Sequence, residues 1–259
     1  MTMIDSHCHI HSSAFELDGD VIIAESKAAG VTKFVCVGTD VDDSRGAVAF
    51  AATRAEVWAS VGIHPHEAKK ESARIGEINK LASRDRVVAI GECGLDYWYE
   101  YSPRDIQKRI FEKQLKIGLK HDLPFIFHIR GSKSDPNDAF VDFFKIVEKY
   151  ENIRGVVHSF SAGHDQLKGV LSKSLKVGVN GIATFSQDQS MLRALTVMPS
   201  GVFMLETDTP YLTPVPKRGK VNSPKYMGYT AKFLAELRET TVADIETSTT
   251  RTAEQLFGI

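Results

Sequence analysis

The sequence predicts an α/β protein with a single domain over residues 1–259, folded as a (β/α)8, or TIM, barrel. Eight short, apolar, β-branched segments alternate with longer segments whose apolar residues recur every three or four positions. The length of 259 residues also fits one such barrel, which typically takes roughly 250 residues. An open, doubly wound sheet has the same alternation, but the number of strands and this length favour the barrel.

The expected strands read more often as continuous apolar runs than as strict alternation, which is typical of a parallel sheet covered on both faces. They lie at residues 2–10, 31–39, 57–65, 87–96, 124–130, 154–161, 175–185 and 202–212. Helical periodicity is clearest at residues 20–30, 73–85, 103–122, 225–239 and 241–258. Residues 213–226 are rich in proline, lysine and arginine, and we expect a long loop there.

Composition narrows the class of protein. A hydrophobic share of 42% with 25% charged residues is ordinary for a globular chain, and no apolar run is long enough to span a membrane. The net charge of −1 means that contact with nucleic acid would depend on a local basic patch. Three scattered cysteines do not make a disulfide framework, and the first residues lack the pattern of a secretory signal. We therefore expect a cytoplasmic protein without membrane association or an obligate protein partner.

Histidine and acidic residues interrupt the predicted strands near their carboxyl ends. His7 and His9 stand two residues apart on the first strand with Asp5, so the three side chains point to one face. Glu92 follows an apolar run, where burying an unpaired carboxylate is costly. A single histidine of this kind could be a polar edge residue or a satisfied core residue. Because the carboxyl ends of barrel strands converge, the whole set predicts metal ligands in one place: His7, His9, Glu92, His128, His158 and Asp208.

Four imidazoles and two carboxylates are enough for two divalent metal ions. We assign His7, His9 and Asp208 to one ion and the other two histidines to the second, with Glu92 as the bridge. Such a pair lowers the pKa of a bridging water and polarises a phosphoryl or carbonyl oxygen. Asp208 and Glu92 are therefore the expected catalytic residues, with Asp208 as general base. The identity of the metal is not decided among Zn²⁺, Mn²⁺ and Mg²⁺, although imidazole-rich sites favour the first two.

Other polar side chains near strand ends have open roles. His64 is expected to bind substrate phosphate or to hydrogen-bond a ligand, whereas His66 could equally be a solvated loop residue. Glu206 could orient the site or be a buried, hydrogen-bonded side chain. Four basic residues could bind an anionic substrate, although loop lysines are usually solvated: Arg130, Lys217, Arg218 and Lys220.

Several motifs occur in a fixed order along almost the whole chain: DSHCHI (5–10), GIHPH (62–66), GECGLDYW (91–98), FHIR (127–130), HSFSAG (158–163), GVNGIATF (178–185), ETDTPYLTP (206–214) and RTAEQLFGI (251–259). In this order they are specific, and through them the chain resembles the TatD family of metal-dependent deoxyribonucleases among the amidohydrolase-like barrels. The resemblance implies a TIM-type barrel and metal-dependent hydrolysis of phosphodiesters. It also implies metal ligands at the six strand-end residues and His64 beside the substrate phosphate.

Three functions remain open. The first is an exonuclease that hydrolyses single-stranded or frayed DNA from an end. The second keeps the same site but hydrolyses an ester, lactone, amide or D-aminoacyl-tRNA, because such metal ions serve both chemistries. The third is a non-catalytic metal-binding scaffold, which would have no need of the candidate base. The basic loop from Lys217 to Lys220 favours a phosphate-rich substrate.

Overall fold

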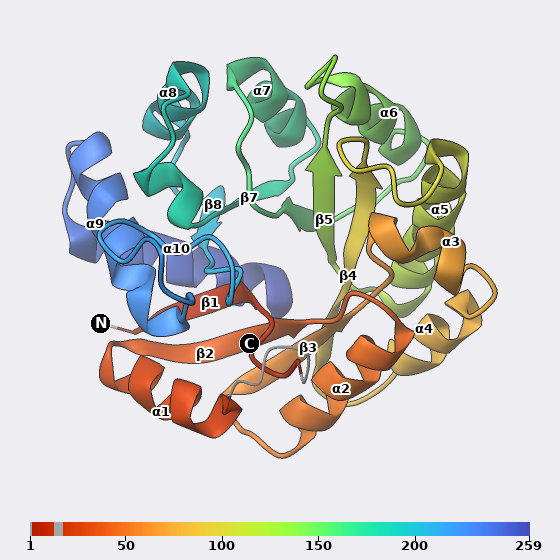
Figure 1. Ribbon diagram of the computed structural model, residues 1–259, viewed down its shortest axis with the longest axis horizontal. Helices are drawn as coiled ribbons and strands as arrows, with labels where there is room; N and C mark the ends of the chain where they lie inside the picture. The colour runs from red at the N-terminus through yellow and green to blue at the C-terminus, as the bar shows by residue number, and fades with distance from the viewer. Residues whose placement is uncertain (1, 13–17) are drawn as a thin grey trace. The chain divides into compact units, whose positions relative to one another are not determined.

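The computed structural model describes residues 2–12 and 18–259 and has the predicted fold class. Eight parallel strands alternate with helices, and the order of the strands in the sheet is their order in the chain (Figure 1). The strands are β1 (Met3–Cys8), β2 (Val31–Val37), β3 (Val57–Val61), β4 (Val87–Asp96), β5 (Phe125–Arg130), β6 (Gly155–Val157), β7 (Lys176–Val179) and β8 (Phe203–Leu205). This order is that of a (β/α)8 barrel, and each strand lies in a segment that the sequence predicted.

The helices follow the strands as the periodicity predicted. They are α1 (Gly19–Ala28), α2 (Val41–Ala52), α3 (Ala68–Glu71), α4 (Ile75–Leu81), α5 (Arg104–His121), α6 (Asp138–Val147), α7 (His164–Ser172), α8 (Gln189–Val197), α9 (Met227–Leu237) and α10 (Val242–Phe257). Short 3-10 helices are η2 (Pro65–Glu67), η3 (Gly181–Thr184) and η4 (Pro224–Tyr226), the last of which ends the predicted loop. Within the described ranges, no helix has the length and apolar character needed to cross a membrane.

The chain divides into two compact units. Unit 1 comprises residues Met1–Cys36 and Ser159–Ile259, and unit 2 comprises Val37–His158. The prediction of a single domain over residues 1–259 stays a prediction.

In unit 1, β1 is bound on both sides by other strands of the same unit. It pairs in parallel with β2, and an isolated parallel bridge joins Cys8 to Thr209, just after β8. Strand β8 pairs in parallel with β7. Helix α10 packs against β1 and β8 (Figure 1). Its ends are set locally, because Thr241 and Asp244 form a capping box and Gly258 ends the helix with a φ of 69°.

In unit 2, β4 pairs in parallel with β3 and β5, and α5 packs against β4. The ring of Phe111 on α5 stacks on Phe143 at 5.7 Å and meets Phe127 edge-on at 5.8 Å. Helix α5 approaches β5 so closely that a Cβ on Gly118 would lie 2.3 Å from the ring of Phe125. Each aromatic side chain buried here contributes about 1.5–3 kcal/mol of hydrophobic stabilisation.

Two buried glutamines on α5 hold the chain at the ends of β3 and β4. Gln114 Oε1 accepts from Ile63 N at 2.7 Å, and its Nε2 donates to Ile63 O at 3.0 Å. Gln107 Oε1 accepts from Asp96 N at 2.8 Å, and its Nε2 donates to Asp96 O at 2.9 Å. Each amide therefore satisfies both backbone groups of one residue, as buried backbone requires. Helix α5 thereby fixes the chain immediately before His64.

Replacing Gln114 by Ala should lower the free energy of unfolding by about 2–4 kcal/mol, because two buried backbone groups of Ile63 lose their partners. Urea denaturation followed by circular dichroism measures this loss. Lys113→Ala on the exposed side of the same helix is the matched control and should change stability by less than about 0.5 kcal/mol. Equal stability of the two variants would show that the Gln114 amide does not hold the chain there.

Candidate metal centre

Three side chains of unit 1 meet at the neighbouring ends of β1 and β8. Backbone hydrogen bonds fix the two segments, because Asp208 N donates to His7 O at 2.8 Å and His9 N donates to Thr209 O at 2.9 Å. His7 and His9 stand two residues apart in extended chain, so their imidazoles lie on one side with ring centroids 5.1 Å apart. His7, His9 and Asp208, which the sequence assigned to one ion, therefore lie together.

The donor atoms of this group are spaced like the ligands of one metal ion. His7 Nε2 lies 3.3 Å from His9 Nε2, and Asp208 Oδ1 lies 3.5 Å from the first and 3.3 Å from the second. Tetrahedral ligands about 2.0 Å from a zinc ion lie about 3.3 Å from one another. Two imidazoles and a carboxylate are also a donor set that binds Zn²⁺ and similar ions. The group therefore fits a divalent metal ion in spacing and in chemistry.

Asp5 binds the end of β8 beside this group. Its carboxylate accepts from Thr207 N at 2.9 Å, Thr207 Oγ1 at 2.5 Å and His7 N at 3.3 Å. Burial raises the pKa of Asp5 to about 8, although these hydrogen bonds oppose the rise. The sequence placed Asp5 on the ligand face without a role. In the structure it joins the strand that carries His7 to the segment that carries Asp208.

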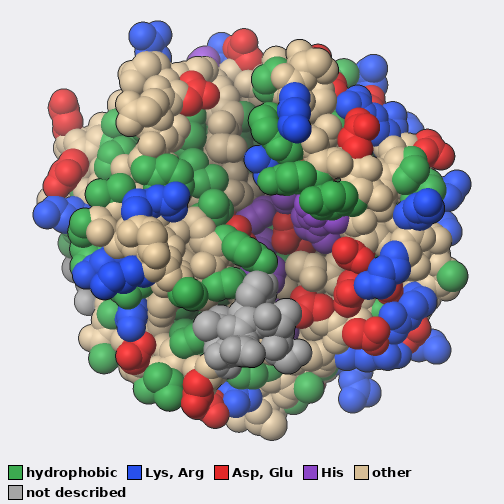
Figure 2. Space-filling model, viewed as in Figure 1, with side chains coloured by type: hydrophobic (Ala, Val, Ile, Leu, Met, Phe, Trp, Pro, Cys, Tyr) green, Lys and Arg blue, Asp and Glu red, His purple; other side chains and the backbone are tan. Residues whose placement is uncertain are grey.

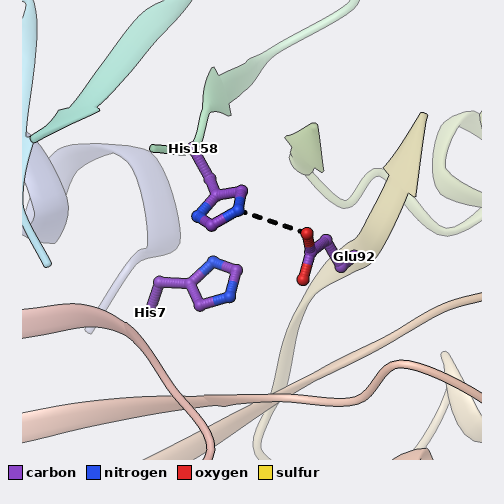
Figure 3. A group of neighbouring side chains, drawn as sticks. All are labelled: His7, Glu92 and His158. Atoms are coloured by element: carbon purple, nitrogen blue, oxygen red, sulfur yellow. Dashed lines mark ion pairs between the residues drawn. The ribbon is translucent and has the colours of Figure 1, made fainter. Parts of the chain in front are cut away.

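In unit 2, three imidazoles surround the carboxylate of Glu92. Glu92 Oε1 lies 2.7 Å from His128 Nδ1, 3.2 Å from His158 Nε2 and 3.4 Å from His64 Nε2. Figure 3 shows Glu92 on β4 and its ion pair with His158. Ligand atoms of His64, Glu92 and His128 all lie within 4.8 Å of one another. This second group also fits a divalent ion, and it includes His64, which the sequence placed at the substrate.

Burial and charge set the protonation of this group. Burial lowers the pKa of His64 to about 4, although Glu92 opposes the shift, so the imidazole is neutral at pH 7. Burial acts to raise the pKa of Glu92, but attraction by His158 and His64 and hydrogen bonds from His128 and His158 lower it well below its usual value. Glu92 is therefore a carboxylate at neutral pH. Carboxylates and neutral imidazoles are the forms that bind a metal ion.

Asp96, at the end of β4, is a further candidate to which the sequence reasoning gave no role. Its Oδ2 lies 3.0 Å from both His128 Nε2 and His66 Nε2. Burial acts to raise the pKa of Asp96, but hydrogen bonds from His128 and His66 lower it far below its usual value. A carboxylate on the second nitrogen of a ligating imidazole fixes the ring and makes it a better donor. The signal in the sequence is its spacing of four from Glu92, which puts both carboxylates on one face of the strand.

The remaining predicted site residues have other surroundings. Glu206 is buried and accepts from Ser159 N at 2.6 Å and Asn180 Nδ2 at 3.1 Å, which is the buried, hydrogen-bonded role left open for it. The guanidinium of Arg218 lies 4.0 Å from the centroid of the Phe185 ring. Its role in substrate binding stays a prediction.

Comparison with known proteins assigns nearly the whole chain to one family. The family model described as TatD related DNase matches residues 4–258. The chain belongs to the TatD family. The prediction of this family from the ordered motifs is confirmed.

Curated TatD-type relatives cover nearly the whole chain. The uncharacterized metal-dependent hydrolase YabD of Bacillus subtilis (strain 168) is 32% identical over 258 residues, which cover 99% of both chains. The 3'-5' ssDNA/RNA exonuclease TatD of Cronobacter sakazakii is 33% identical, with 98% of this chain and 97% of that protein covered. The crystal structure of YJJV, a TatD homolog from Escherichia coli K12, matches with a TM-score of 0.90 and 24% identity over 99% of this chain and 98% of its own. This protein is a TatD-type metal-dependent hydrolase with the fold of that homolog.

Adding Zn²⁺ or Mn²⁺ to metal-stripped protein should raise its stability, because the candidate ligand atoms of each group lie together in the folded chain only. An ion at 100 times its dissociation constant stabilises by about 2.7 kcal/mol per site. Thermal unfolding together with elemental analysis of the bound metal measures this effect. His9→Ala and His128→Ala should each reduce both the stabilisation and the metal content, whereas His164→Ala, an exposed histidine on α7, should change neither. Unaltered metal content in His9→Ala and His128→Ala would contradict the assignment.

Proposed function

We propose that this TatD-family protein is a deoxyribonuclease that removes nucleotides from an end of single-stranded or frayed DNA. The observation that carries the proposal is the presence of two carboxylate–imidazole groups, one around Asp208 and one around Glu92, at strand ends of a (β/α)8 fold. Active sites of this fold lie at the carboxyl ends of its strands. Relatives named 3'-5' ssDNA/RNA exonuclease support the substrate class and favour shortening from the 3' end.

We propose that each group holds a divalent ion, one beside Asp208 and its two histidines and one beside Glu92 and its imidazoles. Bound ions of this kind lower the pKa of a water and polarise a phosphoryl oxygen. Donor sets rich in imidazole bind Zn²⁺ and Mn²⁺ more tightly than Mg²⁺, which prefers oxygen ligands. We therefore expect the protein to retain Zn²⁺ or Mn²⁺ through purification.

Asp208 is our candidate for the general base that takes the proton of the attacking water. Its side chain is 14% exposed, whereas the neighbouring His7 side chain is fully buried, so solvent reaches this carboxylate. The hydrogen bond from Asp208 N to His7 O fixes its backbone before substrate arrives. A base positioned in this way typically contributes 10²–10⁴-fold to a hydrolytic rate.

His64 is our candidate for a contact to the substrate phosphate. Its Nδ1 accepts the backbone N–H of His66 at 3.2 Å, so a neutral ring carries its proton on Nε2, facing Glu92. That N–H can donate to a phosphate oxygen that approaches Glu92. Arg218 would add positive charge to the same anionic substrate. The net charge of −1 is compatible with this, because an enzyme acting at an end holds only a few nucleotides.

End-labelled single-stranded DNA should be shortened stepwise from the 3' end by metal-loaded protein, and not by stripped protein. Asp208→Asn should reduce the rate by about 10²–10⁴-fold, because it removes the proton acceptor and weakens a ligand. Glu92→Gln should reduce it at least as far. Denaturing gel electrophoresis after return of Mg²⁺, Mn²⁺ or Zn²⁺ measures both effects, with His164→Ala as the control variant.

Failure of folded, metal-loaded protein to cleave DNA or RNA would contradict the nuclease proposal. A panel of esters, lactones, amides and D-aminoacyl-tRNA would then test carbonyl hydrolysis at the same groups. Activity that survives in both carboxylate variants would instead contradict a catalytic role for either group.

A further inference from the structure

An exposed aromatic segment follows β4 directly. Trp98, Tyr99 and Tyr101 are 39%, 46% and 67% exposed, and we call these three side chains the aromatic platform. The rings of Tyr99 and Tyr101 are stacked, with centroids 5.5 Å apart and planes 14° from parallel. Large aromatic side chains are more often buried, so three exposed ones in four residues are unusual and call for a functional explanation.

Two cations lie over this platform. Arg130 Cζ is 5.0 Å from the centroid of Trp98 and 5.1 Å from that of Tyr99, and Lys133 Nζ is 5.5 Å from Trp98. Within residues 2–12 and 18–259, neither Arg130 nor Lys133 has a carboxylate within ion-pair distance. Their positive charge is therefore available to an anionic ligand that also covers the rings.

The aromatic platform is tied to the second metal group through one carboxylate. Asp96 Oδ1 accepts the backbone N–H of Trp98 at 2.9 Å and of Tyr99 at 3.1 Å, while Oδ2 binds His128 and His66. The ring of His66 lies 4.3 Å from that of His64. Asp96 thus holds the platform at a fixed place beside the residues that surround Glu92.

A run of ring contacts leads outward from the metal group to the platform. The centroid of His66 lies 4.8 Å from that of Tyr101 and 5.4 Å from that of Tyr99. Figure 2 shows hydrophobic side chains next to the histidines on the face that it draws. Aromatic rings and cations therefore lie together on this surface, which suits a ligand that has both flat rings and negative charge.

We propose that the aromatic platform stacks the bases of single-stranded nucleic acid next to the nucleotide being cleaved, with Arg130 and Lys133 contacting its phosphates. This inference rests on the proposed nuclease function and adds the element that distinguishes a nucleic acid from other phosphodiesters. Every base has a flat face, so stacking binds single strands with little sequence preference. A duplex end must fray before its bases can reach the platform.

Stacking energies of this kind correspond to an affinity change of roughly 5- to 150-fold for each base removed. A hexanucleotide with phosphorothioate linkages, which resists hydrolysis, should therefore bind metal-loaded protein more tightly than the same oligomer with abasic sites. In a Trp58→Phe background Trp98 is the remaining tryptophan, and its fluorescence should fall when the base-bearing oligomer binds. Titration of this fluorescence gives the affinity for each oligomer without any cleavage.

Tyr99→Ala and Tyr101→Ala should each remove most of the preference for base-bearing over abasic oligomer, and Tyr99→Phe should keep it, because the flat ring remains. Fluorescence anisotropy of a labelled oligomer checks the variants. Tyr150→Ala is the control, because this partly exposed tyrosine belongs to the same unit but is not part of the platform. The thermal midpoints of Tyr99→Ala and Tyr101→Ala should match that of the parent protein, since these two rings are exposed.

Equal binding of base-bearing and abasic oligomers by the parent protein, or a preference that survives in both tyrosine-to-alanine variants, would overturn the platform. Absence of binding by either oligomer would overturn it as well. These results are distinguishable from failure of the nuclease proposal. Base-dependent binding without cleavage contradicts the nuclease alone, whereas cleavage with no effect of bases or of the tyrosine variants contradicts the platform alone.

Discussion

The burial of the Glu92 carboxylate is the constraint on which the surrounding structure depends. A charged carboxylate removed from water is unstable by several kcal/mol unless partners replace its hydration. The partners here are imidazoles from the turn after β3 and from the ends of β5 and β6, at 2.7–3.4 Å. Three segments distant in sequence must therefore arrive with little positional error. The parallel sheet fixes the positions of these segments. The Gln114 amide on α5 also fixes the chain where it leaves β3, just before His64.

Each group of candidate ligands also has a second carboxylate beside it that holds its residues in place. Asp96 fixes the far nitrogen of His128, and Asp5 joins the strand of His7 to the segment before Asp208. Their pKa values move in opposite directions, because Asp96 accepts from two imidazoles whereas burial dominates at Asp5. Asp96 is thus a negative charge beside a candidate metal ligand, while Asp5 forms hydrogen bonds to backbone groups next to His7 and Asp208.

The fold and the candidate ligand residues can be predicted from the sequence because their physical signals are local. Apolar runs that end in a histidine or a carboxylate identify both a buried strand and its functional end, as at His128 and Glu92. Contacts between side chains of different strands have no such local signal in the sequence. Nothing local shows that His64 would lie as close to Glu92 as a ligand does, or that Asp96 would bind two imidazoles at once. Those contacts depend on the pairing of β3, β4 and β5, and so they are visible only in the three-dimensional structure.

The candidate metal ligands and the proposed base-stacking surface lie on neighbouring parts of the same junction between β4 and the loop that follows it. The same β4 that buries Glu92 continues through Asp96 into Trp98 and Tyr99, so a single stretch of chain passes from a buried charge to exposed rings. The two oxygens of Asp96 face in the two directions, one toward His128 and one toward the backbone of the aromatic platform. Loops tolerate change while the strands that support them do not. We therefore expect substitutions at residues 98–101 and at the basic side chains near them to alter substrate binding, while the candidate metal ligands around Glu92 keep their places at the strand ends.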